Sequence, residues 1–247
     1  MIEFQQLTRT YGDFTAVQPL SLTVERGEVF GFLGPNGAGK TTTIRMMMGI
    51  LVPSGGRALI QGLDCHSQRA EVQRHVGYLP DNPIYYDFLR GREILRFVAE
   101  MHGMPRAEAG QRAVEMLAEF GLTDVVDEFA VNYSMGMKKK LGLACALIHD
   151  PEVLILDEPI NGLDPRAARE VQKRLKQAAA SGKTIFMSTH LLDMAEKVCT
   201  RVGIIHRGEL VATGTLEELR ERVEQNASLE KLFLAITDEE AAQAPGP

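Results

Sequence analysis

Residues 34–41, which read Gly-Pro-Asn-Gly-Ala-Gly-Lys-Thr, restrict the possible folds of this chain more than any other segment. They fill every fixed position of the pattern Gly-x-x-x-x-Gly-Lys-Ser/Thr, in which backbone N–H groups surround phosphate oxygens. Residues 28–33 before them read as a buried strand, and residues 41–49 after them read as a helix. A glycine-rich turn without a ligand is the alternative, but such a run rarely matches in this context by chance. The segment therefore predicts an α/β fold that binds a nucleoside triphosphate.

Each residue type in this segment has an expected role in holding phosphate. A helix that begins near Gly39 points its positive end toward the anion. Lys40 is expected to reach the β- and γ-phosphates, and the Thr41 hydroxyl to bind Mg²⁺. The predicted nucleotide-binding residues are Gly34, Pro35, Asn36, Gly37, Ala38, Gly39, Lys40, Thr41 and Thr42.

A second apolar run, residues 153–157, ends in two acids, Asp157 and Glu158. A parallel strand that is buried on both faces reads as such a run, and ligands of open α/β sheets bind at its carboxyl end. Asp157 is expected to hold Mg²⁺, directly or through water, and Glu158 to polarise an attacking water. A plain helix-capping or surface pair is the alternative, which the phosphate-binding pattern makes less favourable. More than a hundred positions separate Lys40 from Asp157, so something must be inserted between the two strands.

Composition sets the compartment and the size of the core. The chain has 247 residues, of which 45% are hydrophobic, enough for one large α/β domain or a core with a subdomain. The three cysteines, Cys65, Cys145 and Cys199, have no C-x-x-C spacing, so neither a disulfide framework nor a zinc site is indicated. We expect no signal peptide, and no apolar stretch approaches the roughly 20 residues of a membrane span. A cytoplasmic location is predicted.

The net charge of −6 argues against nucleic acid as the main partner, because proteins that bind it usually have a basic excess or patch. The basic run 138–140 has two interpretations, a solvated helix face or part of a motif. No nucleic-acid partner is expected.

Residues 133–140, Tyr-Ser-Met-Gly-Met-Lys-Lys-Lys, stand shortly before the acidic strand and resemble the signature motif of ATP-binding cassette (ABC) proteins, commonly Leu-Ser-Gly-Gly-Gln. The resemblance extends over about residues 2–235. Further matches are Tyr11 for the adenine-stacking aromatic, residues 77–81 for the Q-loop, residues 161–164 for the D-loop and residues 188–190 for the switch histidine. The variant signature and residues 228–234 resemble the subgroup that energises exporters with separately encoded membrane subunits.

The resemblance implies a P-loop NTPase with a RecA-like core, an N-terminal antiparallel β region and an inserted helical lobe at about residues 82–150. The cassette domain is expected to span residues 1–237, followed by a C-terminal tail, residues 238–247. The implied activity is ATP hydrolysis with ATP and Mg²⁺, coupled to export. Helical apolar spacing at residues 94–101 and 114–120 supports the lobe.

The resemblance also implies roles for five further residues. Tyr11 would stack on adenine, although it could instead cover the edge of the core. His190 would contact the γ-phosphate, although a histidine at a helix N-terminus is the alternative. Ser134 and Gly136 would meet the ATP of a second subunit, with Ser134 capping the helix that follows. Asp81 replaces the usual glutamine or glutamate of the Q-loop, so its shorter side chain is expected to reach Mg²⁺ only through water.

Because the implied signature helix serves a second subunit, the working unit is expected to be a dimer, either with itself or with a homologous subunit. An integral membrane subunit is the second expected partner, which would place this chain on the cytoplasmic face of the cell membrane. Residues 83–89 are either core or a contact for that subunit. A soluble cassette that clamps nucleic acid or ribosomes is the alternative function, but neither long heptad coiled coils nor a second cassette is present.

Overall fold

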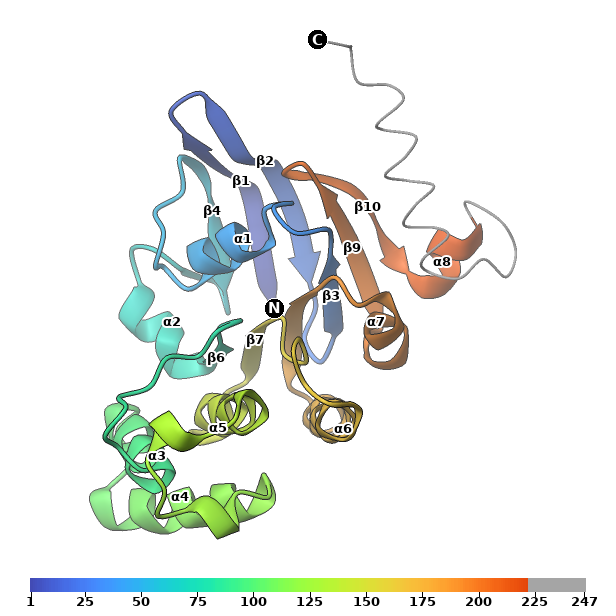
Figure 1. Cartoon of the computed structure of the whole chain (residues 1–247). Coiled ribbons are helices and arrows are strands. Elements are labelled where there is room, and N and C mark those ends of the chain that lie inside the picture. The colour runs from blue at the N-terminus through green and yellow to red at the C-terminus, as the bar shows by residue number, and fades with distance from the viewer. Residues whose placement is uncertain (222–247) are drawn as a thin grey trace. The chain divides into compact units, whose positions relative to one another are not determined.

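The computed structural model describes residues 1–221 (Figure 1). These residues divide into two compact units, the first from residues 1–72 with residues 184 onward, and the second from residues 73–183. The expected helical lobe, residues 82–150, lies within the second unit. The expected tail, residues 238–247, and the exporter-like segment 228–234 lie outside the described residues.

The first unit begins with an antiparallel sheet of strands in the order β2-β1-β4-β5. Alternating burial along β1 gives it one face toward the core and one toward solvent. The predicted N-terminal antiparallel β region is therefore confirmed. The strands are β1 (Ile2–Tyr11), β2 (Phe14–Val24), β4 (Gly55–Ile60) and β5 (Leu63–Asp64).

A second group of strands in the first unit carries the phosphate-binding pattern. β3 (Val29–Leu33) lies between β8 (Thr184–Thr189) and β9 (Arg201–His206) and is parallel to both, and β10 (Glu209–Thr215) is antiparallel to β9. Every residue of β3 and β8 is buried, as the apolar run of β3 predicts. The helices that follow strands of this unit are α1 (Lys40–Met47), α7 (Leu192–Val198) and α8 (Leu216–Glu221).

The second unit pairs β6 (Val76–Leu79) with β7 (Val153–Asp157) in parallel register. A side chain at Gly77 would meet the backbone carbonyl of Ala146, so glycine lets α5 pack closely on β6. The helices are α3 (Gly91–Met101), α4 (Arg106–Glu119), α5 (Met135–Leu147) and α6 (Pro165–Ala180), with short 3₁₀ turns η1 (Thr123–Val125) and η2 (Ala130–Asn132). α2 (Arg69–His75) crosses the boundary between the units in sequence.

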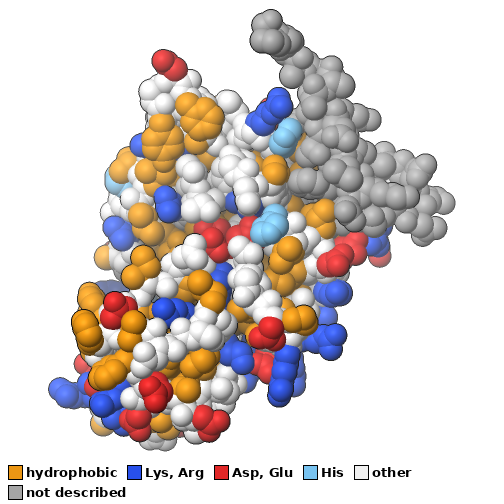
Figure 2. Space-filling model, in the orientation of Figure 1, with side chains coloured by type: hydrophobic (Ala, Val, Ile, Leu, Met, Phe, Trp, Pro, Cys, Tyr) orange, Lys and Arg blue, Asp and Glu red, His pale blue; other side chains and the backbone are white. Residues whose placement is uncertain are grey.

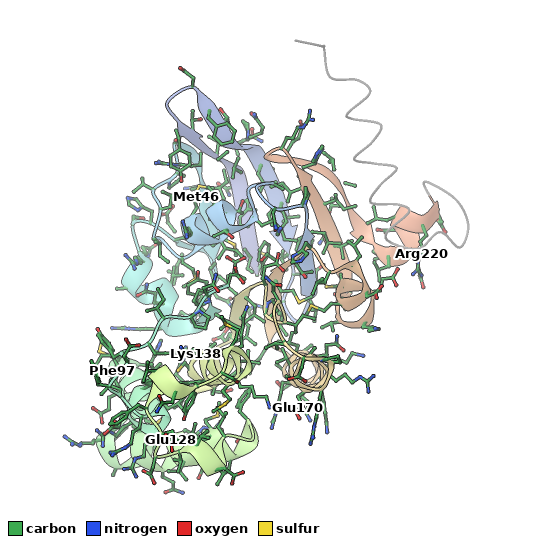
Figure 3. The ribbon with its side chains drawn as sticks, in the orientation of Figure 1. Met46, Phe97, Glu128, Lys138, Glu170 and Arg220 are labelled. Carbon is green, nitrogen blue, oxygen red and sulfur yellow. The ribbon has the colours of Figure 1, made fainter. Side chains whose placement is uncertain are left out.

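The apolar spacing predicted the helices of the lobe correctly, but not every apolar side chain of the pattern is buried. Ile94 and Leu95 of α3 are buried, whereas Phe97, labelled in Figure 3, and Met101 are 50% and 70% exposed. Val114 of α4 is likewise exposed. Figure 2 shows hydrophobic side chains among charged ones on this part of the surface. The pattern specifies a helix period, but only packing decides which side of a broad apolar stripe is covered.

No helix among residues 1–221 has the length and the apolar content that crossing a membrane would need.

Candidate nucleotide site

The phosphate loop joins β3 to α1, and packing requires a glycine at each of its two ends. A side chain at Gly34 would contact the carbonyl oxygen of Ile205, and one at Gly39 would lie 2.7 Å from the carbonyl oxygen of Ala16. Gly39 also has φ 107°, a conformation that side chains disfavour. Gly37, with φ 81°, has no atom within 4 Å of such a position. The loop is thus tightly packed at both ends and open at Gly37.

Lys40 closes this loop. Its side chain is buried, and Nζ donates hydrogen bonds to the carbonyl oxygens of Gly34 at 2.7 Å and Pro35 at 3.1 Å. The neighbouring Thr41 and Thr42 are partly exposed at the start of α1. A cation, backbone N–H groups and a hydroxyl therefore gather at the amino end of one helix, the combination that suits phosphate oxygens.

His190 lies just past the end of β8, next to the end of β3 from which the phosphate loop begins. Leu33, the last residue of β3, pairs with Thr189, the last residue of β8, so Gly34 and His190 follow from adjacent positions of two parallel strands. This arrangement places His190 at a carboxyl strand end, as the sequence predicts.

Tyr11 ends β1 with its side chain 46% exposed, which fits a stacking surface better than a cover for the core. The guanidinium of Arg9 lies 4.5 Å from the centroid of its ring. Sequence analysis did not identify Arg9. Arg9 and Tyr11 are two positions apart in a strand and therefore lie on the same face, which was the available signal.

In the second unit, the two acids lie at the carboxyl end of β7, where the sequence places them: Asp157 is its last residue and Glu158 follows it. Asp157 and Glu158 are 1% and 7% exposed, and Glu158 has φ 48°, in the left-handed region. Leu79, the last residue of β6, pairs with Leu156, so the loop that carries Asp81 begins at the same edge. Unusual backbone geometry of this kind is concentrated at functional sites.

Lys139 of α5 connects these two loops. Its side chain is 2% exposed, and Nζ donates to the carbonyl oxygen of Glu158 at 2.5 Å and to Asp81 Oδ1 at 3.3 Å. Burial lowers the pKa of Lys139, and the charge of Asp81 opposes this effect. The residue lay within the basic run 138–140 whose role the sequence left open. Its position four residues before the buried Leu143, on the same helix face, was the missed signal.

The signature segment begins α5 as predicted. The Ser134 side chain accepts a hydrogen bond from the backbone N–H of Met137 at 3.3 Å and so caps the helix. A side chain at Gly136 would come no closer than 3.8 Å to its neighbours Leu163 and Ser134, an ordinary contact. Nothing within the described residues therefore explains why a glycine stands there.

The parallel strands with a glycine loop at a helix N-terminus define a P-loop NTPase, a class whose members bind nucleotide phosphates on that loop. Residues 17–161 match the family described as ABC transporter. The chain belongs to the ABC transporter family and contains its ATP-binding cassette.

Two relatives show the extent of the similarity. The probable multidrug ABC transporter ATP-binding protein YbhF of Escherichia coli is 38% identical over 89% of this chain. The bacitracin transport ATP-binding protein BcrA of Bacillus licheniformis is 38% identical over 90% of this chain and 72% of its own length. The chain spans only 38% of the length of YbhF.

Two solved structures share the fold. A structure of the ATP-binding subunit of an ABC transporter superposes with a TM-score of 0.89 and 34% identity, covering 96% of this chain and 99% of that one. A dimeric ATP-binding cassette in a post-hydrolysis state, bound to ADP and Pi, has a TM-score of 0.81 at 22% identity and covers 87% of this chain and 99% of its own.

Proposed function

We propose that this chain is the ATP-hydrolysing nucleotide-binding subunit of an ABC exporter, in which ATP-driven dimer closure drives export through a separate membrane subunit. The phosphate loop carries the proposal, because Gly34 and Gly39 admit no side chain and Lys40 is held on the loop carbonyls. Relatives named for multidrug and bacitracin transport support export.

The donor atoms of the chain fit ATP with Mg²⁺. The loop residues 34–42 and the exposed ring of Tyr11 would hold the nucleotide, and Thr41 and Asp157 would each supply the oxygen ligand that Mg²⁺ prefers. When bound, Mg²⁺ neutralises charge on the β- and γ-phosphates. Asp81 has a hydrogen-bond donor at each oxygen, Lys139 at Oδ1 and Asn82 at Oδ2, so we propose that it acts on Mg²⁺ through water.

Glu158 and His190 are the proposed catalytic residues. The carboxylate of Glu158 would accept a hydrogen bond from the attacking water and orient it. His190 would contact the γ-phosphate, which its place after β8 supports, because β8 is register-matched to the strand that leads into the phosphate loop.

Ser134 and Gly136 are proposed to contact the ATP of the opposite subunit. The exposed Ser134, the free space at Gly136 and the dimeric cassette of similar fold support this reading. The second subunit would be another copy of this chain or a homologue of it.

The loop at residues 83–89 is proposed to contact the membrane subunit at the cytoplasmic face of the membrane. Ile84, Tyr86 and Phe88 are 93%, 72% and 85% exposed, so these side chains are not core. Tyr85 points the other way and donates a hydrogen bond to the carbonyl oxygen of Lys138 at 2.8 Å, which anchors the loop on α5. A fixed loop with three exposed apolar side chains is suited to binding a protein partner.

A mixing experiment tests the shared site. Ser134→Arg and Lys40→Ala chains, each inactive alone, should regain ATP-dependent dimerisation and partial ATPase activity when combined. In the mixed dimer, both lesions fall on one composite site, and the other site joins a normal loop to a normal signature. A monomer that hydrolyses ATP at full rate at every protein concentration would contradict the proposal.

A further inference from the structure

Outside the residues proposed to bind nucleotide, Lys139 of α5 is a charged side chain in a buried position. The largest fully buried side chains of residues 1–221 are apolar, apart from that of Lys139. An ammonium at such a position needs partners that compensate for its lost hydration. Lys139 has two, the backbone carbonyl of Glu158 and the carboxylate of Asp81, on two different loops.

The contact with Glu158 falls on a strained peptide. With φ 48°, Glu158 has a conformation that costs a residue with a side chain free energy and persists only when its surroundings enforce it. The carbonyl oxygen that Lys139 holds at 2.5 Å belongs to this same residue. Fixing the carbonyl restricts rotation of the peptide that follows Glu158, and so restricts the direction of its carboxylate.

We propose that Lys139 is a positioning residue for ATP hydrolysis, which holds Glu158 in its left-handed conformation and couples it to the loop of Asp81. The inference rests on the proposed role of Glu158 in orienting water. Any displacement of the Asp81 loop would reach Glu158 through one ammonium group, so the two loops of the second unit would change state together.

The chain contains a matched control at the other end of β7. Lys183 Nζ donates to Asp150 Oδ1 and to the carbonyl oxygen of Pro151, both at 2.6 Å. Asp150 also has a left-handed backbone, with φ 53°. Both lysines thus join a carboxylate to a backbone carbonyl beside the same strand. Lys183 does so before its amino end, and the whole of the strand separates this contact from the acids.

The experiment compares Lys139→Met with Lys183→Met in the full chain. Both variants should lower the unfolding temperature, since each leaves an acidic side chain without its ammonium partner. Lys139→Met should lower kcat by about 10–100-fold, the scale expected when a reacting group is displaced by about 1 Å, without changing affinity for a non-hydrolysable ATP analogue. Lys183→Met should keep the wild-type kcat.

A kcat for Lys139→Met as high as that of Lys183→Met would overturn the proposal. If the methionine variant does not fold, Lys139→Gln replaces it, because its neutral amide removes the ammonium group that joins the two loops, and Lys183→Gln becomes the control in the same comparison.

A double variant separates positioning from an independent effect. If Lys139 acts through Glu158, adding Lys139→Met to Glu158→Gln should slow single-turnover hydrolysis no further than Glu158→Gln alone. If the double variant were instead slowed by the product of the two single-variant factors, the inference would be overturned. A wild-type rate in Glu158→Gln alone would instead remove the proposed role of Glu158, and the two failures are therefore distinguishable.

Discussion

The loop after β3 and the loop after β7 are each held by a buried lysine, but they differ in the residues that have a left-handed backbone. Each follows a five-residue strand that is buried throughout, and each is held by a buried lysine that donates to backbone carbonyls, Lys40 in one and Lys139 in the other. They differ in which residues have left-handed backbones. In the phosphate loop these are Gly37 and Gly39, whereas the residue directly after β7 is Glu158.

This difference follows from what each loop presents. The phosphate loop offers backbone N–H groups, so a side chain at the turn would only obstruct the anion, and glycine has little strain there. The acidic loop presents the side chain of Glu158, so glycine cannot replace this residue. The strain of its left-handed backbone, about 1–2 kcal/mol, therefore has to be offset by packing and by Lys139. We expect the first loop to govern binding and the second to govern turnover.

The sharpest test of this division is Glu158→Gln. It should reduce kcat by about 10²–10⁴-fold and leave ATP affinity unchanged, because the amide keeps the shape but loses the proton acceptor. The variant should accumulate as an ATP-bound dimer, detectable by size-exclusion chromatography. Wild-type turnover in the purified variant would break the division.

The converse variant, Lys40→Ala, should weaken ATP binding by about 10–100-fold, the range expected for the loss of charge-assisted hydrogen bonds. Nucleotide titration measures this affinity, and Glu158→Gln is its control. If Lys40→Ala bound ATP as tightly as wild type, the phosphate loop would not govern binding in the way described.

Alanine substitutions within the phosphate loop separate backbone strain from packing. Gly37→Ala should cost about 1–2 kcal/mol of unfolding free energy through its positive φ alone. Gly39→Ala should cost more, because its new methyl would also lie 2.7 Å from the carbonyl oxygen of Ala16. Urea unfolding without nucleotide makes the comparison, and equal losses would show that packing contributes nothing.

The last test concerns a histidine outside both loops, whose effect is absent at pH 7. Burial lowers the pKa of His149 to about 4, and the charges of the stacked His102 and of Lys183 act in the same direction, opposed by the hydrogen bond to Val76 and by the charge of Asp150. The native state thus disfavours the proton that the unfolded chain binds below about pH 6.5.

Stability should therefore fall as the pH drops from about 6.5 to 4, and this loss should be smaller in His149→Gln. Thermal unfolding across this range measures it. At pH 7, His149→Gln should keep wild-type ATP affinity, and a loss of affinity there would connect His149 to the phosphate loop.

The sequence predicted those parts of the site that local patterns determine. The buried strands at residues 29–33 and 153–157 follow from apolar runs, and the N-cap Ser134 from a short polar side chain before a helix. The paired position of His190 beside the phosphate loop also follows from strands that end at a common edge.

The rest depended on packing between elements distant in sequence. Lys139 reads as part of a charged run, and only the contact of α5 with the loops of Asp81 and Glu158 makes it a buried ion-pair partner. The exposure of Phe97 and Met101 likewise depends on which elements cover α3. A pattern along one helix contains no information on its neighbours.

The contact of Arg9 with Tyr11 has a consequence for the choice of base. The guanidinium covers one face of the ring, so a nucleobase would stack on the other. Stacking is sequence-tolerant, because every base has a π-face, and it does not read the hydrogen-bonding edge that distinguishes adenine from guanine. A site built on Tyr11 and the loop of Lys40 would then recognise the triphosphate far more strongly than the purine, and GTP would compete with ATP according to its concentration.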